Sequence, residues 1–179
     1  MGWSIIPIME TTPWEVNSKN VSDAYIAGFL DGDGSIGVHI EKRPDRRRFP
    51  YRVRLKINFT QHMRHKNLMF LLKESLGKVG NIRDVRTHNL AELVIQKRSD
   101  IKVTLLRLLP HLILKQRQAR IALAMIDVFD GGIVNVRSSL SDKDYEKLFA
   151  MANELRNLNA GAGGKKSYEI INPVTTHFA

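Results

Sequence analysis

Cysteine is absent from the 179-residue sequence, which excludes disulfide bonds and metal sites built on thiolates. Long apolar runs are absent as well, since none approaches the ~18–20 residues that span a bilayer. Basic residues are missing ahead of the short apolar patch in the opening segment MGWSIIPIMETTPWEV, so we expect no signal peptide there. These absences favour an intracellular protein of the cytoplasm, the nucleoid or an organelle, which is neither secreted nor bound to a membrane.

Positive charge is present in excess, with 28 Lys and Arg residues against 18 Asp and Glu residues and a formal net charge of +10. Residues 41–56 (EKRPDRRRFPYRVRLK) contain eight basic and two acidic residues and therefore carry +6 of that charge. A positive field concentrated in this way favours a polyanionic partner, because binding releases condensed counterions. The alternative interpretation is a basic hairpin that is simply solvated.

The chain divides into three parts. Residues 1–19 form an irregular N-terminal arm, because Pro7 and Pro13 interrupt any regular element. Residues 20–160 have the hydrophobic periodicity of one folded domain, and the length of the chain suits a single core. Residues 161–179 form a tail without a recognisable period.

Hydrophobic periodicity predicts an α+β domain with one antiparallel sheet. Helical spacing covers 21–33 (capped by Asn20), 65–76 (ended by Gly77), a short helix from Ser99 to before Pro110, 115–128, and a helix capped by Ser141 and Asp144 that ends near 158. Alternating residues predict two hairpins, the first from strands beginning at Ser35 and covering 52–59, the second from 81–86 and 90–96. The predicted order is α-β-β-α-β-β followed by helices.

The segment YIAGFLDGDGSIGVHI at 25–40 contains two aspartates between glycines. An EF-hand calcium loop is excluded, because it requires glycine at Ile36, glutamate at Lys42 and a following helix. Asp31 and Asp33 lie at the predicted C-terminus of a helix, where the helix dipole disfavours an acid unless a cation joins it. Exposed carbonyl oxygens at such an end also suit Mg²⁺. These arguments leave a simple turn and a metal site about equally supported.

The nine residues 26–34 (IAGFLDGDG) resemble the signature of the LAGLIDADG homing endonucleases, and 109–119 (LPHLILKQRQA) provide a second match. The resemblance spans about residues 22–128. It implies the αββαββα homing-endonuclease fold with a DNA-binding antiparallel sheet and extra C-terminal helices, in agreement with the predicted order of elements. It also implies a site-specific double-strand DNA endonuclease, encoded within an intron or intein-like element, that leaves short 3′ overhangs.

The resemblance assigns roles to residues of the catalytic site. Asp33 would bind the metal together with the backbone carbonyl of Gly32. Gln61 would order the water of the active site, and Lys115 would lie near the scissile phosphate. His65 occupies a basic position at which relatives have arginine. The implied cofactor is Mg²⁺, with Mn²⁺ as a substitute and Ca²⁺ binding without supporting cleavage.

Small residues on the motif helix predict a seam where two helices pack closely. Such glycines can also pack against the chain's own core, which is the alternative. The only second copy of the motif would be 123–132 (LAMIDVFDGG), which lacks the small pair and is not followed by basic strands. One motif per chain implies a two-fold homodimer that brings two Asp33 carboxylates together. The predicted interface residues are Tyr25, Ala27, Gly28, Phe29, Asp31 and Gly32, of which Asp31 mainly supports the helix end.

A basic two-stranded ribbon fits the major groove, so alternating outward residues are predicted to read base edges of double-stranded DNA. They are Gly37, His39, Glu41 and Arg43, then Arg52, Arg54, Lys56 and Asn58, with a weaker set of Arg83, Arg86, Glu92, Val94 and Gln96. Arg46, Arg47 and Arg48 in the intervening loop are predicted to bind phosphates. Each half of the dimer would read half of a long, roughly palindromic site. The rival hypotheses are an RNA-splicing maturase of the same fold, with RNA as partner, and a DNA-binding regulator that does not cleave.

Overall fold

The computed structural model describes residues 21–43, 45, 51–131 and 140–159. In chain order the elements are α1 (Asp23–Asp33), β1 (Gly34–Lys42), β2 (Tyr51–His62), η1 (Met63–His65), α2 (Lys66–Ser75), β3 (Asn81–Val85), η2 (Arg86–His88), β4 (Leu90–Ile95), α3 (Arg98–Leu108), η3 (Leu109–His111), α4 (Gln116–Gly131) and α5 (Asp142–Leu158). The arm, the tail and the three arginines 46–48 lie outside the described residues, so predictions about them stay predictions. None of the described helices is long and apolar enough to cross a membrane.

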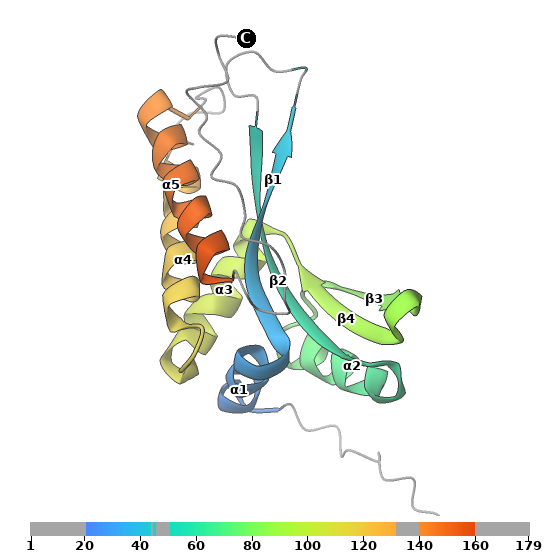
Figure 1. Ribbon diagram of the computed structural model, residues 1–179. Coiled ribbons are helices and arrows are strands. Elements are labelled where there is room, and N and C mark those ends of the chain that lie inside the picture. The colour runs from blue at the N-terminus through green and yellow to red at the C-terminus, as the bar shows by residue number, and fades with distance from the viewer. Residues whose placement is uncertain (1–20, 44, 46–50, 132–139, 160–179) are drawn as a thin grey trace, which may run out of the picture.

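The four strands form one antiparallel sheet in the order β1-β2-β4-β3. The β1–β2 hairpin is the longest pairing and runs from Gly34 opposite Phe59 to Lys42 opposite Tyr51. The helices lie on one side of the curved sheet, with α4 and α5 along the hairpin and α2 below β3 and β4 (Figure 1). This arrangement confirms the predicted α+β fold with additional C-terminal helices.

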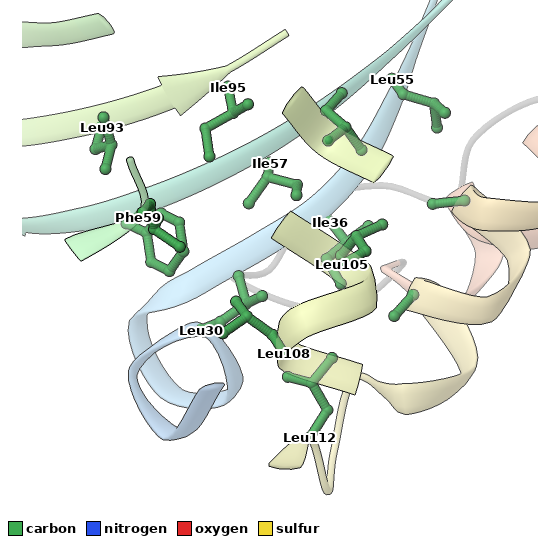
Figure 2. Close-up of a cluster of buried hydrophobic side chains, with 14 of the residues drawn as sticks. Leu30, Ile36, Leu55, Ile57, Phe59, Leu93, Ile95, Leu105, Leu108 and Leu112 are labelled. Carbon is green, nitrogen blue, oxygen red and sulfur yellow. The ribbon is translucent and has the colours of Figure 1, made fainter. Parts of the chain in front are cut away.

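The core lies between the sheet and the helices. Alternate strand residues point into it, and Figure 2 shows Ile36, Ile57 and Phe59 converging on leucines of the helical layer. The intervening residues of the same strands are polar and face away from the helices, which is the pattern of a sheet with one buried face. The hydrophobic alternation that predicted the strands is therefore the side-chain pattern that buries them.

Two predicted helix caps are wrong. Helix α1 is capped by Ser22, whose hydroxyl accepts a hydrogen bond from the amide of Tyr25 at 3.2 Å, and not by Asn20. Helix α3 begins at Arg98 without a side-chain cap, so Ser99 lies inside its first turn. The cap at Ser141 is confirmed, because its hydroxyl accepts from the amide of Asp144 at 3.1 Å.

The glycine predicted at the end of α2 is confirmed. Gly77 has a positive φ of 82°, a conformation that favours glycine. Its amide donates to the carbonyl of Glu74 at 3.0 Å, and the amide of Lys78 donates to the carbonyl of Lys73 at 2.8 Å. These two bonds close the last turn in the Schellman pattern.

Candidate active site and nucleic-acid interface

Helix α1 ends where the chain turns directly into β1. Gly34 occupies this junction, and a Cβ atom added to it would lie 2.6 Å from Leu30 Cδ1 and 2.8 Å from Leu30 Cα. Only glycine therefore allows the strand to start so close to the last turn of the helix. This junction leaves the side chain of Asp33 exposed at the C-terminal end of α1, while Asp31 is turned inward with 8% of its surface exposed.

Asp31 holds the segment that joins η3 to α4. Its carboxylate accepts hydrogen bonds from three consecutive backbone amides, those of Ile113 at 2.7 Å, Leu114 at 3.1 Å and Lys115 at 2.9 Å. Burial acts to raise the pKa of Asp31, but the amide donors and the Lys115 ammonium outweigh it, so the pKa lies below the ordinary value of 3.8. A carboxylate in this position stays ionised and fixes the loop to the motif helix.

Lys115 is directed back to the same helix end. Its ammonium group donates a hydrogen bond to the backbone carbonyl oxygen of Asp31. Burial lowers the pKa of Lys115 below the ordinary 10.5, against the raising effect of the Asp31 and Asp33 carboxylates. The structure thus brings Asp33 and Lys115, which are distant in sequence, into one electrostatic neighbourhood at the end of α1.

Gln61 and His65 are held by local contacts. Gln61 lies near the end of β2, two residues beyond Phe59, which pairs with Gly34 at the start of β1. Its side-chain oxygen accepts from the amide of His62 at 2.8 Å. His65 stands at the start of α2, where its Nε2 atom accepts from Arg64 Nε at 3.0 Å. The catalytic role of His65 stays a prediction.

The small-residue face of α1 differs from the predicted interface. Ala27 has no exposed surface and packs in the chain's own core, so it is wrong as a member of an exposed seam. Asp31 is buried and binds the loop, which agrees with its expected role of supporting the helix end. Phe29 is half-buried and stacks against Phe59 with ring centroids 6.2 Å apart. Three of the predicted interface residues, Tyr25, Gly28 and Gly32, are exposed, and so is Ala24 on the same side of the helix.

Two exposed apolar residues next to this face were missed from the sequence. Ile113 is 84% exposed and Leu114 is 72% exposed, and their amides are those bound by Asp31. A signal was present, because the three consecutive apolar residues 112–114 before Lys115 cover too wide an arc to be buried together by one helix face. Because their amides are bound to Asp31, they add exposed apolar surface near the C-terminal end of α1.

The outward face of the β1–β2 hairpin carries the predicted basic residues. Across the hairpin Gly37 pairs with Lys56, His39 with Arg54 and Glu41 with Arg52. His39, Arg52 and Arg54 are exposed. Two of the basic residues are paired with acids, since Arg54 lies 2.9 Å from Glu41 and Arg43 lies 3.1 Å from Asp45.

The second predicted set forms a connected network on β2, β3 and β4. Glu92 lies 2.5 Å from Arg83 Nη2 and accepts from Asn58 Nδ2 at 3.0 Å, and Asn58 also donates to Thr60 Oγ1 at 3.1 Å. Burial acts to raise the pKa of Glu92, but the hydrogen bonds from Asn58 and Arg83 outweigh it and the pKa is lowered. The network keeps Glu92 ionised and fixes the Arg83 side chain, which remains exposed.

Several individual predictions for this face need correction. Asn58 is only 7% exposed and Val94 is also buried, so neither is free to read a base, and the mostly buried Glu92 is occupied by Arg83 and Asn58. Arg86 lies in η2, after the end of β3, and Gln96 follows the end of β4, so both extend from turns. Alternation in the sequence shows which residues face outward. It does not show which of them are free to contact a base and which are bound to residues of a neighbouring strand.

The donor set at the end of α1 suits a hard divalent cation, because it combines the exposed Asp33 carboxylate with backbone carbonyl oxygens of a helix end. Within the described part of the chain, no group of three or more His, Asp or Glu side chains is arranged to hold a metal. Asp33 is therefore the carboxylate that a single chain offers at this position.

Comparison with known proteins agrees with this geometry. The family model described as LAGLIDADG endonuclease matches residues 26–121. DNA endonuclease I-CvuI of Chlorella vulgaris is 30% identical over 124 residues, which cover 67% of this chain and 75% of that protein. DNA endonuclease I-CreI of Chlamydomonas reinhardtii is 32% identical over 103 residues, covering 58% and 61%. The chain spans 17% of a third relative, the Neurospora crassa protein named "Probable intron-encoded endonuclease 3", at 27% identity.

Solved structures share the fold. I-CvuI bound to the I-CreI target in the presence of 2 mM Mg, with the DNA not cleaved, superposes with a TM-score of 0.69 at 26% identity, covering 83% of this chain and 86% of that one. I-CvuI with its own target in 2 mM Ca gives a TM-score of 0.67 at 25% identity, covering 80% and 85%. The archaeal intron-encoded endonuclease I-Vdi141I bound to DNA has a TM-score of 0.68 at 22% identity, covering 83% and 89%, which is a likeness of fold.

Proposed function

The chain belongs to the LAGLIDADG endonuclease family, and from this we propose that it is a site-specific double-strand DNA endonuclease of the homing type. The observation that carries the proposal is the junction of α1 and β1, where the exposed Asp33 and the ammonium of Lys115 share one electrostatic neighbourhood. Phosphodiester cleavage requires stabilisation of negative charge on the phosphate and activation of a water, and a carboxylate next to a fixed cation suits that task. The products would carry short 3′ overhangs.

The proposed cofactor is Mg²⁺, bound by Asp33 and the backbone carbonyl of Gly32. Such a cation supplies Lewis-acid stabilisation of the phosphate and lowers the pKa of a bound water. Lys115 would place its positive charge beside the scissile phosphate, and Gln61 would orient water with its side-chain amide. We expect Mn²⁺ to replace Mg²⁺ and Ca²⁺ to support binding without cleavage. The complexes of I-CvuI with DNA in Ca or Mg support divalent-metal use by that relative.

The proposed assembly is a homodimer built on the exposed face of α1. Gly28 and Gly32 have open space at their Cα atoms, so another helix backbone can approach them closely. The exposed side chains of Ile113 and Leu114 add apolar surface beside this face, and association would remove it from water. Two-fold symmetry would bring two Asp33 carboxylates together, and a divalent cation would offset their repulsion.

The proposed partner is double-stranded DNA on the outward face of the sheet. Arg52 and Arg54 on the hairpin, with the fixed Arg83 on β3, offer donors of the kind that pair with guanine in the major groove. The overall charge of +10 supports binding to a polyanion. Each chain of the dimer would read one half of a long pseudo-palindromic site.

The test is incubation of the protein with a library of duplex targets in Mg²⁺ and in Ca²⁺, followed by sequencing of the cut ends. We expect cleavage of one target class in Mg²⁺ alone. The variant Asp33→Asn should bind the same DNA and cut none of it. The matched control is Asp130→Asn in the motif-like stretch of α4, where the carboxylate lies on the surface near Arg98 and Lys102.

The outcomes separate the proposed function from its rivals. Specific binding with no nicking by the unmodified protein would identify a regulator. Selective binding of a structured intron RNA, with no duplex cut, would identify a maturase. Cleavage by Asp33→Asn at the unmodified rate would overturn the assignment of the metal site.

A further inference from the structure

Strand β2 is longer than its neighbour β4. The pairing of β2 with β4 starts at Ile57 opposite Ile95 and continues to the end of β2. Residues 51–55 of β2 pair with β1 on one edge, and no described strand pairs with their other edge. We call residues 38–42 and 51–55, which pair with each other, the distal hairpin. It extends alongside α5, away from the rest of the sheet (Figure 1).

A tyrosine of α5 binds the free edge of the distal hairpin. The Tyr145 hydroxyl accepts a hydrogen bond from the amide of Tyr51 at 3.0 Å and donates to the carbonyl oxygen of Tyr51 at 3.1 Å. One side-chain oxygen therefore satisfies both backbone groups that a neighbouring strand would have paired. Because backbone groups alternate between the two edges of an antiparallel strand, those of Val53 and Leu55 face the same edge as those of Tyr51.

The side chain of Tyr145 is held in place by its surroundings. Its side chain is buried, and its ring lies 4.8 Å from the ring of Phe149, which in turn lies 5.8 Å from the ring of Tyr51. Burial raises the pKa of Tyr145 above its ordinary value of 10.0, so the hydroxyl keeps the proton that it donates. Packing in this aromatic cluster fixes the position of the Tyr145 hydroxyl. The hydrogen bonds of that hydroxyl in turn fix the end of β2 at Tyr51.

The distal hairpin carries basic side chains on its outward face. Arg52 pairs across the hairpin with Glu41, and Arg54 forms an ion pair with the same glutamate at 2.9 Å. A cavity of about 670 Å³ lies beside this edge; its lining includes Arg52, Arg54, Arg98, Phe129, Tyr145 and Leu148. Residues 51–55 of β2 therefore border a cavity on the edge where β4 pairs with the rest of the strand. On this edge, the backbone of β2 is held by Tyr145.

We propose that Tyr145 is a positioning residue for DNA reading, which clasps the end of β2 and sets where Arg52 and Arg54 meet the major groove. The inference rests on the proposed function. Under this proposal, the DNA-binding face of the sheet has two parts that are positioned independently of each other. The distal hairpin depends on α5 through Tyr145, whereas Arg83 and Glu92 pair with each other across β3 and β4 and do not depend on it.

The experiment compares Tyr145→Phe with Tyr51→Phe. Both variants remove one phenolic oxygen from the same aromatic cluster, but Tyr51 takes part in the clasp only through its backbone. Two measurements are made on the full chain. Amide hydrogen exchange of Tyr51 is followed in the free protein, and base preference at every position of the target is measured in Ca²⁺ from a library of single-base variants.

In Tyr145→Phe we expect the Tyr51 amide to exchange faster, on the order of tenfold, because its acceptor is gone. Discrimination should fall by about tenfold at the target positions whose preference also falls in Arg52→Ala. Positions that respond to Arg83→Ala should keep their preference. Tyr51→Phe should match the unmodified protein in both measurements. A merely structural role for Tyr145 would weaken all positions equally.

Each contrary result has a distinct meaning. Unchanged hydrogen exchange of the Tyr51 amide would show that the Tyr145 hydroxyl does not hold the backbone of Tyr51. Faster exchange with an unchanged base profile, or with a uniform loss over all positions, would overturn the positioning role alone. Absence of base preference in the unmodified protein would overturn the proposed function, and this inference with it.

Discussion

Lys115 and Asp31 are joined twice at the end of the motif helix. The Asp31 carboxylate accepts from the amide of Lys115 at 2.9 Å, and the Lys115 ammonium donates to the carbonyl oxygen of Asp31. The lysine is therefore fixed at both its backbone and its charged end, although the two residues are 84 positions apart in sequence. Under the proposed function, this double contact turns a flexible side chain into a preorganised cation beside Asp33.

Replacement of Lys115 should slow DNA cleavage more than it weakens DNA binding. We expect Lys115→Ala to reduce the single-turnover cleavage rate on the order of 10²–10³-fold, because a preorganised charge is lost next to the phosphate. The Kd for target DNA in Ca²⁺ should change far less. Single-turnover kinetics with filter binding measure both quantities, and equal losses in the two would contradict a catalytic role.

The lysine should also set the alkaline limit of the reaction. Burial lowers the pKa of Lys115, so its ammonium is lost as the pH rises through a value below 10.5. We expect the cleavage rate to fall in that range and the alkaline limb to move to higher pH in Lys115→Arg, because arginine stays protonated. Lys147→Arg on the exposed surface of α5 is the control, and its pH profile should match that of the unmodified protein.

Asp31 should contribute to stability in a pH-dependent way. Its folded pKa lies below the ordinary 3.8, so the unfolded chain binds more protons in the acidic range. The contribution is fully present above pH 3.8 and is lost as the pH falls through the folded pKa. We expect Asp31→Asn to lower the free energy of unfolding by about 1–3 kcal/mol at neutral pH, because three amides lose a charged acceptor.

Urea unfolding above and below pH 3.8 checks this expectation. The difference between the variant and the unmodified protein should shrink on acidification. Asp127→Asn, an exposed carboxylate on α4 that pairs with Lys102 at 2.8 Å, provides the surface comparison and should cost under about 1 kcal/mol. A difference for Asp31→Asn that stays constant with pH would mean that its ionised carboxylate does not stabilise the loop.

The strands and the core were predictable because they depend on local alternation. Each outward residue of β2 between Arg52 and Asn58 is polar and each inward one is apolar, so the strand and its core-facing side follow from the sequence alone. The cap of α1 was not predictable in this way. Two contacts, between the Val21 amide and the Ser75 hydroxyl at 3.0 Å and between Arg107 and Asp23 at 2.5 Å, fix where that helix begins.

The site was predictable only where its residues carry the family motif. The resemblance assigns roles to Asp33 and Lys115, which stay predictions, but the contact of Asp31 with the loop depends on amides that are more than 80 residues away. The prediction for Ala27 is wrong because this residue lies on the buried side of α1, which Ile26 and Leu30 already mark in the sequence. Asn58 was misjudged because its burial depends on β4, a strand distant in sequence.

The network around Glu92 gives a prediction about specificity. Asn58→Ala and Glu92→Gln should each flatten base preference at the same target position as Arg83→Ala, because both variants release the Arg83 side chain. The exposed residue Asn157 on α5 offers a matched control, and Asn157→Ala should leave the profile unchanged. Loss of preference at a different position in Asn58→Ala would mean that Asn58 itself reads a base.

Two glycines of the motif should respond oppositely to the same substitution. A Cβ at Gly34 would overlap Leu30, including its backbone, so Gly34→Ala should destabilise the folded chain by about 1–3 kcal/mol. A Cβ at Gly28 would meet nothing within 4 Å in the single chain. Alanine is also about 1 kcal/mol better than glycine inside a helix, so Gly28→Ala should not lower the stability of the isolated chain.

Gly28→Ala should instead weaken the proposed dimer, because a methyl group would separate two helix backbones that pack at this point. Leu114→Lys should weaken it too, since that side chain is exposed in the single chain and would be buried by association. Sedimentation over a range of concentrations measures both effects. We expect the dimer Kd to rise about tenfold or more in each variant without a loss of stability of the monomer, and an unaltered Kd in both variants would place the dimer interface on another face of the molecule.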